Sequence, residues 1–86
     1  MADLKDMVAT NIRRLRHARG WTQEDLAERV GLSARYVGQV ERAQASMTIT
    51  VLGRFADAFA IEAAELVRAI DIPSWSASGP RSAASG

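Results

Sequence analysis

Three side chains within residues 33–42 have the types and the spacing needed to read the edges of DNA bases. Ala34, Arg35 and Gln39 fall on one side of a short predicted helix. Arginine forms a two-pronged hydrogen bond with guanine, glutamine pairs with adenine, and a methyl group contacts thymine; each good pair discriminates by about 1–3 kcal/mol. Two alternatives stay open: Arg35 could contact phosphate only, and Gln39 could brace Gln23 instead of reading a base.

The local chemistry of residues 22–42 predicts two short helices joined by a tight turn. Thr22 and Asp25 have the spacing of a reciprocal cap, in which each side chain bonds the other residue's backbone. Gly31 supplies the positive φ that a sharp turn requires, and Ser33 caps the second helix. A short helix presented in this way suits the major groove of DNA, which is wide enough to admit it.

Apolar residues recur at helical spacing in three further segments of the chain. They predict helices over about residues 3–19, 48–59 and 62–70. The expected fold is therefore all-α, with five helices in a domain of residues 1–72. Residues 73–86 are rich in Ser, Ala, Gly and Pro and would bury too little apolar surface to become ordered, so we expect a disordered tail there.

Composition excludes several classes of function. The 86 residues include one histidine and no cysteine, which excludes a disulfide, a thiolate metal site and a Cys–His nucleophile. We expect no metal, no cofactor and no catalysis, because the sequence also lacks a phosphate-binding glycine loop and a nucleophile motif. Apolar runs are too short to span a membrane and no signal peptide is recognisable, so a cytoplasmic protein is the default expectation.

The net charge argues against strong binding to DNA by a single copy. Eleven basic residues oppose ten acidic ones, which gives a formal charge of +1. Without Arg81, residues 1–72 are neutral overall, whereas strong DNA binders usually carry a basic excess. We therefore expect either a dimer or a partner other than DNA.

Residues 11–66 carry a resemblance to a known family. It depends on Arg16 and on two stretches, WTQEDLAERVGLSARYVGQVER and LGRFADAFAIEAAEL. Its specific features include Gln23 at the start of the second helix, Gly31 at the turn, and the pair Glu41–Arg42. This combination resembles the lambda-repressor-like helix-turn-helix family, in its Xre and Cro branch. Members of that family commonly bind pseudo-palindromic operators as dimers, often to repress nearby genes.

The resemblance also assigns roles to residues beyond the three base-reading candidates, which match the family's own base-reading positions. Gln23 and Arg42 match residues that contact DNA phosphates, from the start of the second helix and the end of the third. Arg16 and Glu41 match a partly buried ion pair that ties the first helix to the third. Tyr36 lies on the same helix, and its hydroxyl either donates to a phosphate or packs on the protein surface.

Three positions depart from the family pattern or from helix propensity. Ala43 stands where glycine normally follows the Glu–Arg pair; it costs about 1 kcal/mol if the backbone there is left-handed, and otherwise the third helix runs on. Glu62 opens the fifth helix, where serine would be the better cap. Gly38 lies inside the third helix, where glycine lowers helix stability by about 1 kcal/mol. It either lets the backbone approach DNA closely or packs against the second helix.

The C-terminal part of the domain contains more apolar residues than one small core needs. We expect a surface patch there that forms a dimer or partner interface. Its residues would be Leu66, Val67, Ile70, Ile72 and, in the tail, Trp75. Trp75 either anchors the tail to such a surface or has no role.

Two functions from different classes fit these patterns. The first is a sequence-specific transcriptional regulator, a repressor that binds double-stranded DNA as a homodimer on an inverted-repeat operator. The second is a protein-binding regulator with the same fold, either an antiactivator that sequesters a transcription factor or an antitoxin that neutralises a toxin. The base-reading residues favour the first function, and the near-neutral charge with the spare apolar residues favours the second.

Overall fold

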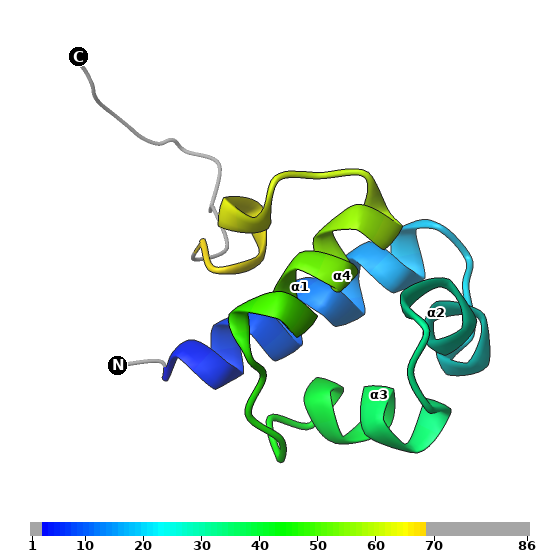
Figure 1. Ribbon diagram of the computed structural model, residues 1–86, viewed down its shortest axis with the longest axis horizontal. Coiled ribbons are helices and arrows are strands. Elements are labelled where there is room, and N and C mark those ends of the chain that lie inside the picture. The colour runs from blue at the N-terminus through cyan, green and yellow to red at the C-terminus, as the bar shows by residue number, and fades with distance from the viewer. Residues whose placement is uncertain (1–2, 69–86) are drawn as a thin grey trace.

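A computed structural model describes residues 3–68 of the chain (Figure 1). Within that range the chain forms four α-helices, one turn of 3-10 helix and no strand, so the all-α prediction is confirmed. The elements are α1 (Leu4–Ala18), α2 (Gln23–Val30), α3 (Ala34–Glu41), α4 (Ile49–Phe59) and η1 (Ala63–Leu66). None of these helices is long and apolar enough to cross a membrane. The predicted tail, residues 73–86, lies outside the described residues, as do Ile70, Ile72 and Trp75.

The five elements pack around one apolar core. α3 lies against both α1 and α2, α4 lies against α2, and η1 packs on α1 and α4. Figure 1 shows α3 on the opposite side of the molecule from η1. The largest fully buried side chains are Ile12, Leu26, Val37, Phe55, Phe59 and Leu66. Each element contributes at least one of them, so no element can detach without exposing apolar surface to water.

Local side-chain chemistry sets where α2, α3 and α4 begin, and for α2 and α3 the capping residues are those that the sequence predicts. The hydroxyl of Thr22 accepts the backbone N–H of Asp25, and the Asp25 carboxylate accepts the backbone N–H of Thr22, both at 3.0 Å. The hydroxyls of Ser33 and Thr48 each accept a backbone N–H three residues further on, at 3.0 and 3.1 Å. Gly31 has a φ of 74° and makes the left-handed turn between α2 and α3.

The sequence predicts an α-helix over residues 62–70, and in the described part of that range, residues 62–68, the structure has the 3-10 turn Ala63–Leu66. Glu62 provides no side-chain cap, and the amide of Asn11 in α1 donates to the backbone oxygens of Leu66 and Arg68, both at 2.8 Å. A contact from α1 therefore uses the backbone oxygens at the end of this turn, and local periodicity contains no sign of it.

The prediction that Leu66 lies on an exposed patch is wrong. Its side chain is 0% exposed and packs in the core with Phe55 and Phe59. The short turn η1, held to α1 by Asn11, directs Leu66 inward. Val67 remains partly exposed, so of the predicted patch it is the one described residue still available to a partner.

Two alanines adopt the left-handed backbone conformation at the ends of helices. Ala43 follows α3 and Ala60 follows α4, each with a φ of 58°. The left-handed alternative for Ala43 is thus the one that the structure adopts. After Ala43, the N–H of Gln44 returns to the carbonyl of Gln39 at 2.8 Å, which closes the end of α3 in the manner of a Schellman turn.

We expect Ala43→Gly and Ala60→Gly each to raise the free energy of unfolding by about 1 kcal/mol, because glycine has no Cβ to clash in this conformation. Urea unfolding measures the change, and Ala18→Gly, at an exposed helical residue of α1, serves as the control that should lower stability. Destabilisation by Ala43→Gly and Ala60→Gly would show that neither residue is strained.

Candidate nucleic-acid interface

One side of α3 faces the core and the other faces solvent. Val37 and Val40 are buried, whereas Arg35 is exposed and Ala34 and Gln39 are partly exposed. The structure thus leaves all three predicted base-reading residues accessible on a helix at the edge of the molecule (Figure 1). This is the placement that a helix needs in order to enter the major groove of DNA.

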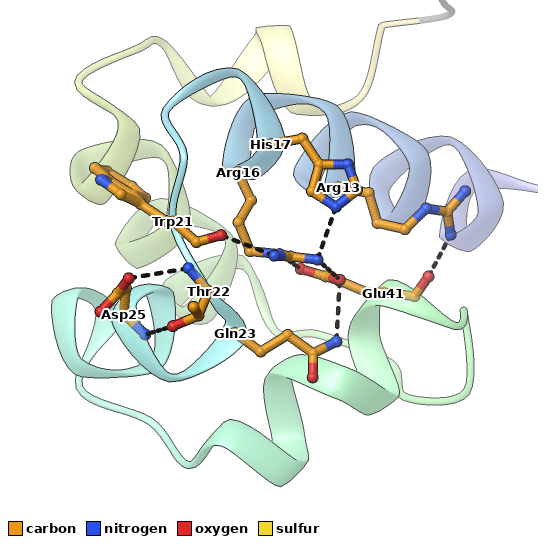
Figure 2. A network of polar contacts seen from close by, with 8 residues as sticks. All are labelled: Arg13, Arg16, His17, Trp21, Thr22, Gln23, Asp25 and Glu41. Atoms are coloured by element: carbon orange, nitrogen blue, oxygen red, sulfur yellow. Dashed lines mark hydrogen bonds and ion pairs between the residues drawn. The ribbon is translucent and has the colours of Figure 1, made fainter.

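The carboxylate of Glu41, at the end of α3, joins three helices (Figure 2). Glu41 is 2% exposed. Arg16 of α1 donates to it twice, from Nε to Oε2 at 2.6 Å and from Nη2 to Oε1 at 3.0 Å. Gln23, the first residue of α2, donates from Nε2 to Oε1 at 3.2 Å. The ion pair that the family resemblance implies is therefore present, in a bidentate form that fixes its geometry.

Two further arginine contacts fasten the same junction. Arg13 donates from Nη1 to the backbone oxygen of Glu41, and Arg16 donates from Nη1 to that of Trp21 at 2.8 Å (Figure 2). Sequence reasoning missed the role of Arg13, although its position three residues before Arg16 places both on one face of α1. Asn11 offered no such signal, because its partner Leu66 is 55 residues away and bonds through its backbone.

Gln23 lies at the start of α2, where the first backbone N–H groups of a helix favour an anion. Its amide nitrogen carries two hydrogens, and the bond to Glu41 uses one of them. The second hydrogen can still be donated to a phosphate. The brace on Gln23 comes from Glu41, so the structure does not require Gln39 for that task.

Tyr36 and Arg42, the other two predicted phosphate contacts, differ in their surroundings. The hydroxyl of Tyr36 donates to the backbone oxygen of Ser46 at 3.3 Å, which ties α3 to the loop before α4 and favours the surface-packing alternative. Arg42 is exposed, and its Nε donates to the side-chain oxygen of Gln44 at 3.0 Å. Its Nη groups take no part in that bond and can meet a phosphate.

The cap at the start of α2 is electrostatically fixed. The backbone N–H of Thr22, followed by the Thr22 hydroxyl, holds the pKa of Asp25 below its ordinary value of 3.8. The pKa of Asp25 is thus lower in the folded protein than in the unfolded chain. The charged cap therefore stabilises the fold at pH values above the unfolded-state pKa, and this stabilisation is lost as the pH falls through the folded-state pKa. The Asp25 carboxylate is therefore charged at neutral pH and caps the start of α2 there.

We expect Glu41→Ala to lower the free energy of unfolding by about 3–5 kcal/mol, because Arg16 would keep a largely buried charge without its partner. Adding Arg16→Met should recover part of the loss, since the unpaired charge is then gone. Urea unfolding measures both, with Glu28→Ala, at an exposed residue of α2, as the control. If Glu41→Ala lowered the free energy of unfolding by no more than Glu28→Ala does, a structural role for the Arg16–Glu41 pair would be contradicted.

Comparison with known proteins places the chain in a family. A family model described as a helix-turn-helix domain matches residues 8–69. The chain is 35% identical over 69 residues to the uncharacterized HTH-type transcriptional regulator y4dJ of Sinorhizobium fredii, a match that covers 80% of this chain and 90% of that protein.

Solved structures share the fold at similar levels of identity. The restriction-modification controller protein C.AhdI of Aeromonas hydrophila has a TM-score of 0.70 at 39% identity, over 72% of this chain and 94% of that one. The controller protein C.Esp1396I, solved as a tetramer in complex with its natural 35 base-pair operator, has a TM-score of 0.69 at 27% identity, over 77% and 87%. The chain therefore belongs to the lambda-repressor-like helix-turn-helix family, in its Xre branch, and is a transcriptional regulator with a helix-turn-helix DNA-binding fold.

Proposed function

We propose that this protein is a sequence-specific repressor that binds an inverted-repeat operator in double-stranded DNA as a homodimer. The solvent side of α3 carries the proposal: Arg35 and Gln39 are accessible on a helix that the Glu41 carboxylate fixes against α1 and α2. Glu41 is the only acidic residue of α3, and Arg16 neutralises it inside the protein. The exposed part of α3 is therefore locally positive although the whole chain carries a charge of only +1.

In this proposal the contacts to DNA are of two kinds. The residues that read base edges are Ala34, Arg35 and Gln39. The residues that hold phosphates are Gln23, Tyr36 and Arg42, the tyrosine only if its hydroxyl leaves the Ser46 oxygen. Base contacts determine which sequence is bound, whereas phosphate contacts set position and contribute equally on every sequence.

The first test measures fluorescence anisotropy with the DNA upstream of the protein's own gene and with a scrambled duplex, across a salt series. Arg35→Ala should weaken binding to the native DNA by about 1–3 kcal/mol and relax its specificity. Arg42→Ala should weaken binding to both DNAs alike and reduce the salt slope by about 1. Arg14→Ala is the matched control, since Arg14 lies on α1 beside Asn11, on the side that faces η1. Uniform losses from both Arg35→Ala and Arg42→Ala would refute base reading by Arg35.

An apolar groove of about 300 Å³ supports the homodimer part of the proposal. It opens between the start of α1, the loop before α4 and Val67. Leu4 and Ile49 both line it and are 55% and 88% exposed, so the groove has an exposed apolar edge. We assign this face to a second copy of the chain, because a self-complementary patch is how homodimers close. The tetrameric state of C.Esp1396I on its operator is consistent with assembly on DNA.

Sedimentation at tens of micromolar should show a dimer, and Ile49→Asp should shift it to a monomer and weaken operator binding, because a charge would be buried in the contact. Thr50→Asp is the matched control, since Thr50 is the exposed neighbour of Ile49 and lies outside the groove. A wild-type monomer under these conditions would count against the homodimer.

The same groove also supports the second candidate function, a regulator that binds a transcription factor or a toxin. Weak, salt-sensitive binding that is equal for the native and scrambled DNAs would favour it over a sequence-specific repressor. A deletion of residues 73–86 that removed binding to such a partner, with DNA binding intact, would locate the protein interface in that segment.

A further inference from the structure

The backbone conformation of Gly38 does not require a glycine. The residue lies in the middle of α3 and, unlike Gly20 and Gly31, it is not among the glycines with positive φ. Glycine in a helix interior lowers helix stability relative to alanine. The reason for its presence must therefore lie in what a side chain at this position would touch.

A Cβ atom at Gly38 would meet the side chains of two residues. It would lie 3.1 Å from Nη1 and 3.7 Å from Nη2 of Arg42, and 3.6 Å from Oε1 of Gln23. The Arg42 guanidinium therefore folds back over the notch that Gly38 leaves in α3, beside the Gln23 amide. Both are side chains that the proposed function assigns to DNA phosphates.

Gln23 and Arg42 each donate a hydrogen bond to another side chain of the protein. Glu41 accepts one N–H of the Gln23 amide at 3.2 Å, and Gln44 accepts the Nε–H of Arg42 at 3.0 Å. The second amide N–H of Gln23 and the Nη groups of Arg42 are left as donors. The Gln23 atom nearest the notch is Oε1, an acceptor, so the donors that an anion would meet at the notch are the Nη groups of Arg42, which carry one full positive charge.

We propose that Gly38 is a positioning residue for Arg42, and that the notch at Gly38 lets the Nη groups of Arg42, beside the side chain of Gln23, form a seat for one phosphate diester of the DNA backbone. This inference rests on the proposed function and adds to it how the phosphate contact of Arg42 is held in place. Both earlier alternatives for Gly38 fit less well. Gly38 is buried in α3, so its backbone is not free to approach DNA, and two of the three atoms nearest to a Cβ at this position belong to Arg42, with only Oε1 of Gln23 coming from α2.

The variant Gly38→Ala makes the proposal testable, because its effects on stability and on affinity should have opposite signs. The new methyl group would approach Nη1 of Arg42 most closely, and because this atom ends a flexible side chain, the fold can accept the methyl group. Alanine favours a helix more than glycine does, so the substitution should raise the unfolding midpoint. Arg42 must move, so affinity for both the native and the scrambled duplex should fall, roughly tenfold, with a salt slope smaller by about 1. Gly53→Ala in α4 is the matched control, since a Cβ there meets nothing within 4 Å, and it should raise stability without changing affinity.

A double-mutant cycle with Arg42→Ala distinguishes the remaining explanations. In the Arg42→Ala protein, Gly38→Ala should cause no further loss of affinity, because the side chain that it displaces is absent. A further loss in that background would mean that the α3 backbone itself approaches DNA, and would overturn the proposal. If Gly38→Ala destabilised the protein, the glycine would serve helix packing. If Gly38→Ala left the affinity for DNA unchanged, no phosphate seat would exist. Either result would overturn the proposal.

The two duplexes also separate this inference from the proposed function. If the wild-type protein bound native and scrambled DNA equally, sequence-specific repression would fail, yet the phosphate seat would still be tested, because phosphate contacts act on any sequence. If it bound neither duplex, both proposals would be wrong.

Discussion

The rest of the structure depends on the buried carboxylate of Glu41. A charge at 2% exposure is strongly unfavourable unless it is paired and hydrogen-bonded, and Arg16 and Gln23 together supply three donors. These donors come from α1 and α2, while the carboxylate belongs to α3. Satisfying one buried charge therefore fixes the mutual orientation of three helices. The apolar core drives the helices together, and this pair selects the arrangement in which α3 faces outward.

The same pair resolves the apparent conflict between a near-neutral chain and a DNA-binding fold. Arg16 pairs with Glu41 inside the protein, so the single acid of α3 adds no net charge to the solvent side of that helix. Arg35 and Arg42 are exposed and carry the positive charge of that surface. Net charge describes attraction at long range, whereas binding at contact depends on which charges remain unpaired on one face. The count of eleven basic against ten acidic residues does not contain that information.

What the sequence predicted and what it missed differ in the range of the interactions involved. The caps at Thr22 and Ser33 and the turn at Gly31 depend on neighbours within a few residues, and the sequence predicts them correctly. The Arg16–Glu41 pair spans 25 residues and was available only from the family resemblance. The turn η1 and the burial of Leu66 depend on Asn11, 55 residues from its partner, and nothing local predicts them. The accessibility of the residues proposed to read bases follows from helical spacing once α3 is placed.

Ala43, just after α3, and Gly38, within α3, both depart from local propensity, and both affect the side chain of Arg42. Ala43 adopts a left-handed conformation that disfavours alanine by about 1 kcal/mol, and this turn returns the N–H of Gln44 to the Gln39 carbonyl at 2.8 Å. The side chain of Gln44 is thereby brought to the Nε of Arg42. Gly38 disfavours the helix but leaves the space into which the Arg42 guanidinium folds. Sequences tend to violate local rules where function requires a particular geometry, and here both violations orient one arginine on the surface that is proposed to meet DNA.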